Sequence, residues 1–165
     1  MKSFNKHLWQ EKGLPDTFSG LIKLALDDLK IAEQSSKYKI NMNTWFKRND
    51  GVCQVCLAGC VLAISLEGEG GPFEVVDIIS DCDEFICKKL FALDEIRKGN
   101  LIRAYSHFIG KDIKEILDFV NFFTNLRSKF YLMNLNREWP TYRLYPDLFK
   151  LNLEILIEEL EKEGL

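Results

Sequence analysis

The sequence predicts a mainly α-helical single domain over residues 1–165, a bundle of about five or six helices with room for a small β-hairpin. Apolar residues recur at spacings of three and four in most segments, which is the period of amphipathic helices. No repeat, low-complexity tract or long linker divides the chain, and its length is usual for one domain. Hydrophobic residues make up 47% of the chain, which favours a packed core over disorder.

The first predicted elements are a helix and an extended segment. Residues 16–35 carry apolar side chains at helical spacing, and Asp16 is suited to cap the start of this helix. Apolar and polar residues alternate in residues 37–45, which predicts a short strand. Asp50 and Gly51 then predict a tight turn.

Residues 51–66 hold three cysteines in an almost wholly apolar run, and this run predicts a buried central helix. Its apolar residues cover every helical face, and a buried cysteine behaves as a small hydrophobe. The small residues would let a neighbouring helix approach closely: Ala58, Gly59 and Ala63. The glycines and proline of residues 68–72 end the predicted helix.

Two helices are predicted next, around a glycine. The first covers residues 83–99 and ends at Gly99, and Asn100 caps a short helix over residues 101–109. The preceding residues 73–79 fit a strand and a helix equally well.

Two longer helices complete the predicted bundle. The last covers residues 147–163 and mixes apolar with acidic residues. The one before it covers residues 111–132, and its predicted apolar stripe consists of Ile113, Ile116, Leu117, Val120 and Phe123.

The composition predicts a cytoplasmic setting without a membrane. The longest apolar run, residues 52–66, is about 15 residues long, whereas a membrane-spanning helix needs about 20. The first residues lack the apolar region of a secretory signal. Five cysteines form an odd number, so we expect reduced thiols.

The cysteines raise the alternative of a zinc site. On one continuous helix Cys53 and Cys60 would lie about 10 Å apart along the axis, too far to share one zinc ion. We therefore expect no metal and no cofactor. The alternative requires Cys53 and Cys56 to precede the helix, with a ligand set drawn from Cys53, Cys56, Cys82, Cys87 and His107.

A reactive thiol is the second chemical alternative. It needs a base, and the only histidines are His7 and His107, neither of which the sequence places beside a cysteine. We therefore assign no catalytic residue. A cysteine-centred enzyme that uses Cys53 and Cys56 remains the alternative to a non-enzymatic protein.

Two segments resemble a group of small uncharacterised bacterial and phage proteins. In that group a tryptophan precedes a C-x-V-C-L-A-G helix, and an L-x-A-L-D-x-[IL]-R-x-G segment follows some thirty residues later. The resemblance implies that the two segments belong to one unit, and it implies no activity. The matching residues are Trp45, Cys53, Val55, Cys56, Leu57, Ala58 and Gly59, then Leu90, Ala92, Leu93, Asp94, Ile96, Arg97 and Gly99.

The charge of the chain is unevenly distributed. The net charge is -3, yet residues 88–143 hold eleven Lys or Arg against six Asp or Glu. Basic and aromatic side chains interleave at the end of this region, as they do in protein interfaces and in single-strand-binding proteins, although an ordinary loop packed on the core has the same composition. The candidate partner-binding residues are Arg127, Lys129, Arg137, Trp139, Tyr142 and Arg143.

These observations favour a non-enzymatic protein-interaction module, encoded by a phage or bacterial accessory gene, that binds a host or cognate protein. Nucleic-acid binding through residues 127–143 is a further hypothesis, which the acidic net charge and the lack of a recognised motif disfavour.

Overall fold

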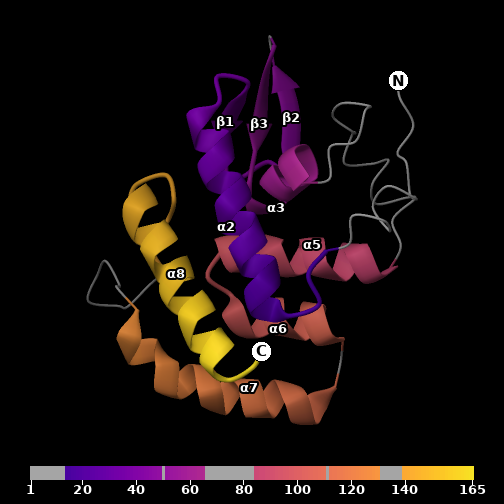
Figure 1. The fold of residues 1–165 in the computed structure, drawn as a ribbon, viewed down its shortest axis with the longest axis vertical. Coiled ribbons are helices and arrows are strands. Elements are labelled where there is room, and N and C mark those ends of the chain that lie inside the picture. The colour runs from indigo at the N-terminus through magenta and orange to yellow at the C-terminus, as the bar shows by residue number, and fades with distance from the viewer. Residues whose placement is uncertain (1–13, 50, 66–83, 111, 131–138) are drawn as a thin grey trace.

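The computed structural model describes residues 14–49, 51–65, 84–110, 112–130 and 139–165, and it confirms the mainly α-helical fold class. These residues form six α-helices and one small sheet (Figure 1). The predicted features over residues 68–72 and 73–79 lie outside the described residues. In chain order the elements are α2 (Phe18–Gln34), β1 (Tyr38–Ile40), β2 (Phe46–Asn49), β3 (Val52–Val55), α3 (Leu57–Cys60), the π-helix η1 (Val61–Ser65), α5 (Glu84–Arg97), α6 (Leu101–Ile109), α7 (Ile113–Leu126), the 3-10 helix η2 (Arg127–Lys129) and α8 (Pro146–Lys162).

The sheet has three strands in the order β1-β3-β2. β2 and β3 are antiparallel and form a hairpin, in which Phe46 pairs with Val55. Gly51 lies in their turn with a φ of 82°, a conformation that glycine adopts without steric cost. β1 lies in the predicted extended segment and adds a parallel strand, in which Ile40 also pairs with Val55.

The predicted helix over residues 51–66 is wrong at its start, because Val52–Val55 form the central strand of the sheet. Cys56 is the N-cap residue of α3, and only α3 and η1 are helical. A short apolar run looks the same on a buried strand as on a buried helix, so its periodicity does not separate them. Hydrogen bonds to both neighbouring strands decide the matter, such as the one from the Cys53 N–H to the Lys37 carbonyl at 2.9 Å.

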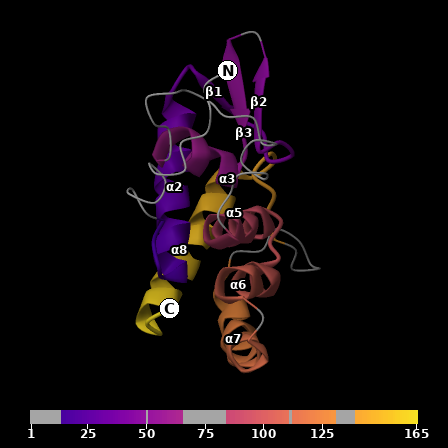
Figure 2. The same ribbon diagram turned by 90° about the vertical axis from the view of Figure 1, so that its right-hand side faces the viewer.

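α2 is the central helix of the domain and packs against α8, α3, η1 and α5 (Figures 1 and 2). α8 runs antiparallel to it, and the Ser19 hydroxyl near the start of α2 donates to the carbonyl of Leu165 at 2.5 Å. Thr17, and not the predicted Asp16, caps α2, since its Oγ1 accepts from the Gly20 N–H at 3.1 Å. Asp16 instead accepts from Lys89 Nζ at 3.3 Å.

The ends of α5 and α6 agree with the predicted boundaries, but Asn100 does not cap α6 as predicted. Gly99 follows α5 with a φ of 80°, as its predicted place at the end of the helix requires. Asn100 occupies the N-cap position of α6, but its side chain makes no capping bond. Its Nδ2 donates instead to Glu95 Oε2 at 2.9 Å, so the side chain faces back to α5.

The predicted apolar stripe of α7 is wrong in part. Ile113 is 74% exposed and Leu117 is 58% exposed, whereas Ile116, Val120 and Phe123 are half-buried. The buried residues of the helix are Phe119 and Leu126. The ring of Phe119 stacks on Tyr105 of α6 at a centroid distance of 4.1 Å. An aromatic ring buries more apolar area than an isoleucine, so the phenylalanine determines which face of α7 turns inward.

Candidate functional site

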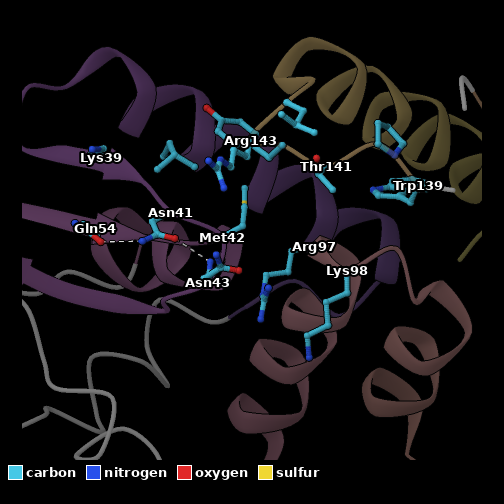
Figure 3. Close-up of a pocket in the computed structure, with 14 residues that line it drawn as sticks. Lys39, Asn41, Met42, Asn43, Gln54, Arg97, Lys98, Trp139, Thr141 and Arg143 are labelled. Atoms are coloured by element: carbon cyan, nitrogen blue, oxygen red, sulfur yellow. Dashed lines mark hydrogen bonds between the residues drawn. The ribbon is translucent and has the colours of Figure 1, made fainter. Parts of the chain in front are cut away.

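A pocket of about 950 Å³ lies between the sheet, the C-terminal end of α5 and the segment that leads into α8 (Figure 3). Residues 39–43 and Gln54 form the sheet side. Arg97 and Lys98 form the helix side, and residues 139–144 form the third side. Three segments that are distant in the sequence therefore converge on one concave surface.

The lining of this pocket is basic. It contains Lys39, Arg97, Lys98 and Arg143, and among the described lining residues there is no carboxylate. Asp94, outside the lining, binds Arg97 Nε at 2.6 Å and Lys98 Nζ at 3.3 Å and so offsets part of their charge. Lys39 and Arg143 are exposed and form no ion pair with any residue that the structure describes. The pocket is thus positive in a chain whose net charge is -3.

Side-chain amides on the sheet side present hydrogen-bond donors. The Asn43 N–H donates to Asn41 Oδ1 at 3.0 Å, and Asn41 Nδ2 donates to Gln54 Oε1 at 2.8 Å. Because its Oε1 already accepts, Gln54 offers its Nε2 group as a donor. The strand register places Lys39 and Lys47 on either side of Gln54, so this row of the sheet is rich in donors.

Tyr142 connects the third side of the pocket, residues 139–144, to the core through a hydrogen bond and a ring contact. Its hydroxyl donates to Glu33 Oε2 at 2.8 Å, and Lys150 Nζ donates to the same carboxylate at 2.9 Å. Its ring packs edge-on against Phe149 at 5.7 Å. Burial, and then the hydrogen bond to Glu33, raise the pKa of Tyr142. Residues 139–144 are therefore held by α2 and α8 together.

Trp139 packs its indole ring at the base of the same segment. A Cβ atom at Gly99 would lie 2.4 Å from the Cβ of Trp139, so the two residues are in close contact. The ring also packs edge-on against Phe130 at 5.2 Å. Its Nε1 is buried and has no hydrogen-bond partner within the described part of the chain.

The structure brings together three of the six predicted partner-binding residues. Trp139, Tyr142 and Arg143 line the pocket. Arg127 and Lys129 lie apart from it on η2, where Lys129 Nζ pairs with Glu159 Oε2 at 3.0 Å. Arg137 lies outside the described residues.

Sequence reasoning missed the other two sides of the pocket. The missed residues include Lys39, Asn41 and Gln54 on the sheet side and Arg97 and Lys98 on the helix side. The alternation of residues 37–45 already placed Lys39 and Asn41 on the polar face of a strand. Nothing in the sequence placed that face opposite residues 139–144.

The three clustered cysteines lie in the interior, although not on one helix. Cys56 and Cys60 are fully buried and Cys53 is nearly so. Burial raises the pKa of the Cys56 thiol to about 11 and also raises the pKa of Cys60. Thiols that are buried and protonated are poor nucleophiles and poor metal ligands.

The described residues offer little support for the zinc alternative. Among them, no three His, Cys, Asp or Glu side chains lie close enough to hold a metal ion. Of the alternative ligand set, Cys82 lies outside the described residues. His7, which was not part of that set, lies outside them too. His107 is on α6, where its ring lies 6.1 Å from that of Phe91.

The two segments for which the sequence suggested a resemblance to bacterial and phage proteins are neighbours in the fold, since α3 packs on α5. No family model matches the chain, and neither a curated protein nor a solved structure matches it. In the part of the chain that the structure describes, every helix is too short or too polar to cross a membrane.

Proposed function

We propose that the protein is a non-enzymatic protein-interaction module that binds a host or cognate protein through the basic pocket. The charge of the lining supports this proposal most directly, because a basic surface on an acidic chain selects partners of opposite charge. Leu144 also lines the pocket and is 67% exposed beside Arg143. Apolar and arginine side chains together are typical of protein interfaces.

The packing of the aromatic rings favours a protein partner over nucleic acid. Single-stranded nucleic acid binds by stacking its bases on available ring faces. Trp139 packs on Gly99 and Phe130, and Tyr142 packs on Phe149. Both rings already pack against other residues of the domain, so they are poorly placed to stack on bases. The pocket instead presents positive charge and amide hydrogen-bond donors to a partner.

We also propose where the protein works, in the cytoplasm, and which kind of gene encodes it. Buried thiols without a disulfide among the described cysteines suit a reducing cytoplasm, and the resemblance suits a phage or bacterial accessory gene. No specific observation favours a cysteine-centred enzyme, because Cys56 and Cys60 are buried and their pKa values are raised.

A capture experiment with charge-reversed variants tests the proposed function. The wild type, Arg143→Glu and Lys114→Glu are immobilised separately and exposed to nuclease-treated bacterial lysate. Lys114→Glu is the matched control, because it makes the same charge change at an exposed residue outside the pocket. We expect a protein that the wild type and Lys114→Glu retain and that Arg143→Glu loses.

Two outcomes would contradict the proposal. One is equal capture by all three proteins, which would remove the pocket from the interaction. The other is the absence of any saturable protein partner, together with salt-sensitive retention on immobilised single-stranded DNA, which would favour nucleic-acid binding.

A further inference from the structure

We infer that the segment bound in the pocket is an acidic peptide that also carries an apolar side chain, an inference that rests on the proposed function. It adds to the proposed function the chemical character of the segment that the partner presents. Three features of the pocket carry it: the separation of its cations, the amide donor of Gln54, and the apolar side chains of Leu144 and Met42.

The cations of the pocket occupy all three of its sides. Figure 3 shows Arg143 on the side of residues 139–144, Arg97 and Lys98 at the end of α5, and Lys39 on the sheet side. A single small anion would pair with the cations of one side and leave the others unpaired. A chain with carboxylates spaced along it can pair with more than one side at once.

The strength of the charge differs among the three sides. Asp94 binds both Arg97 and Lys98, so the helix side carries less free charge than its two cations suggest. Arg143 and Lys39 have no such partner among the residues that the structure describes. The acidic side chains of the peptide therefore gain most at Arg143 and Lys39.

The remaining surface suits a peptide better than a polyphosphate. Gln54 Nε2 is a donor for a peptide carbonyl or a carboxylate, since its Oε1 already accepts from Asn41. Leu144 is 67% exposed, and Met42 lines the same pocket on the sheet side. A phosphodiester backbone has no side chain for these apolar groups, whereas an acidic peptide with a leucine has one.

The test uses labelled synthetic peptides and the full-length protein, with binding measured by fluorescence anisotropy. The probe is a peptide of about twelve residues in which Glu alternates with Leu and Gly, a length chosen to span the pocket. Three matched probes accompany it: the same peptide with Gln for Glu, the same peptide with Ser for Leu, and single-stranded DNA of similar length.

We expect the Glu and Leu peptide to bind more tightly than each matched probe. Arg143→Glu and Lys39→Glu should each weaken its binding by about tenfold or more, because each replaces attraction by repulsion. Lys114→Glu, at an exposed residue outside the pocket, should leave it within about twofold. The affinity should fall as salt rises from about 50 to 300 mM, since exposed charges are screened.

The outcomes separate this inference from the proposed function. Equal binding of the Glu and Gln peptides, or tighter binding of the DNA, overturns the acidic-peptide inference. If no peptide binds while a lysate protein is still lost by Arg143→Glu, the inference fails and the proposed function stands. If peptide binding is insensitive to both Arg143→Glu and Lys39→Glu, the pocket is the wrong site and both fail.

Discussion

Trp45 Nε1 donates a 2.8 Å hydrogen bond to Asp94 Oδ1, which joins the segment before β2 to α5. The same carboxylate binds Arg97 and Lys98, which line the helix side of the pocket. Burial raises the pKa of Asp94, but the hydrogen bonds from Arg97, Trp45 and Lys98 outweigh it, so the net pKa is lowered. Asp94 is therefore ionised near neutral pH. It positions the pocket cations Arg97 and Lys98, and it also links α5 to the sheet through Trp45.

Trp45→Phe should destabilise the protein through this bond. It removes the indole N–H and leaves Asp94 with fewer donors, and hydrogen bonds to charged groups contribute about 1.5–3 kcal/mol. We expect the free energy of unfolding, measured by urea denaturation, to fall by about that amount. In an Asp94→Ala background the same substitution should cost clearly less, and equal costs in the two backgrounds would contradict the coupling.

Gly59→Ala should be more damaging than its small size suggests. A Cβ atom at Gly59 would lie 1.7 Å from the carbonyl oxygen of Trp45, which is a backbone atom. Either the hairpin or α3 must move, and we expect a loss of about 3 kcal/mol or more in the free energy of unfolding.

Gly51→Ala is the control for Gly59→Ala. Its Cβ would have no atom within 4 Å, so only the positive φ of 82° is unfavourable there, at a cost of about 1–2 kcal/mol. Similar small losses at both glycines, measured by urea denaturation, would show that the Trp45 carbonyl is not a steric barrier. The sequence indicated close packing at Gly59, but with a helix; the actual neighbour is the backbone of Trp45.

The helices were predictable where the buried residues recur at the helical spacing of three and four. α2 buries Leu21, Ile22, Ala25 and Leu29, which recur at spacings of three and four, and the turn at Gly51 follows from local geometry alone. Residues 52–55 were not predictable, because a short apolar run satisfies a helix and a buried strand equally. The inward face of α7 was predictable only in part, because apolar residues lie on much of its surface and Phe119 packs on Phe18 and Tyr105 of other helices.

The candidate site was predictable on one side only. The composition of residues 139–143 indicated an interaction surface before any fold was known. Lys39 and Arg97 join that surface through contacts distant in the sequence, and no local pattern encodes them. The positive charge of the pocket could therefore not be predicted from the sequence, because the cations of the three segments come together only in the folded chain.

Asp28→Asn should change the pH dependence of stability. Asp28 of α2 is 3% exposed and accepts from the Ser65 hydroxyl at 2.5 Å. Burial raises its pKa from 3.8 to about 6, against the hydrogen bond from Ser65 and with a smaller contribution from Asp27. A raised folded pKa means that its contribution to stability is full below about pH 4 and is lost as the pH rises to about 6.

We therefore expect the wild type to lose about 2 kcal/mol between these pH values from this one group, and about 3 kcal/mol over its whole titration, as a shift of about two pKa units implies. Asp28→Asn should remove that loss and be more stable than the wild type near neutral pH. Asp27→Asn is the matched control, because Asp27 is exposed and adjacent, and it should keep most of the slope. Parallel curves for the wild type and Asp28→Asn, measured by urea denaturation from about pH 4 to 8, would contradict the assignment.

Thiol reactivity distinguishes the interior cysteines from an accessible one. In a Cys82→Ser background four thiols remain, of which Cys87 is partly exposed and Cys53, Cys56 and Cys60 are buried. With its pKa raised to about 11, Cys56 holds about one part in a thousand as thiolate at about pH 8. We expect a small alkylating reagent to modify Cys87 in the folded protein at least about tenfold faster than the others, and all four after unfolding in urea, as counted by mass spectrometry. Cys87→Ser should abolish the fast phase; rapid modification of Cys56 in that variant would instead place a reactive thiol at the start of α3 and revive the cysteine-centred alternative.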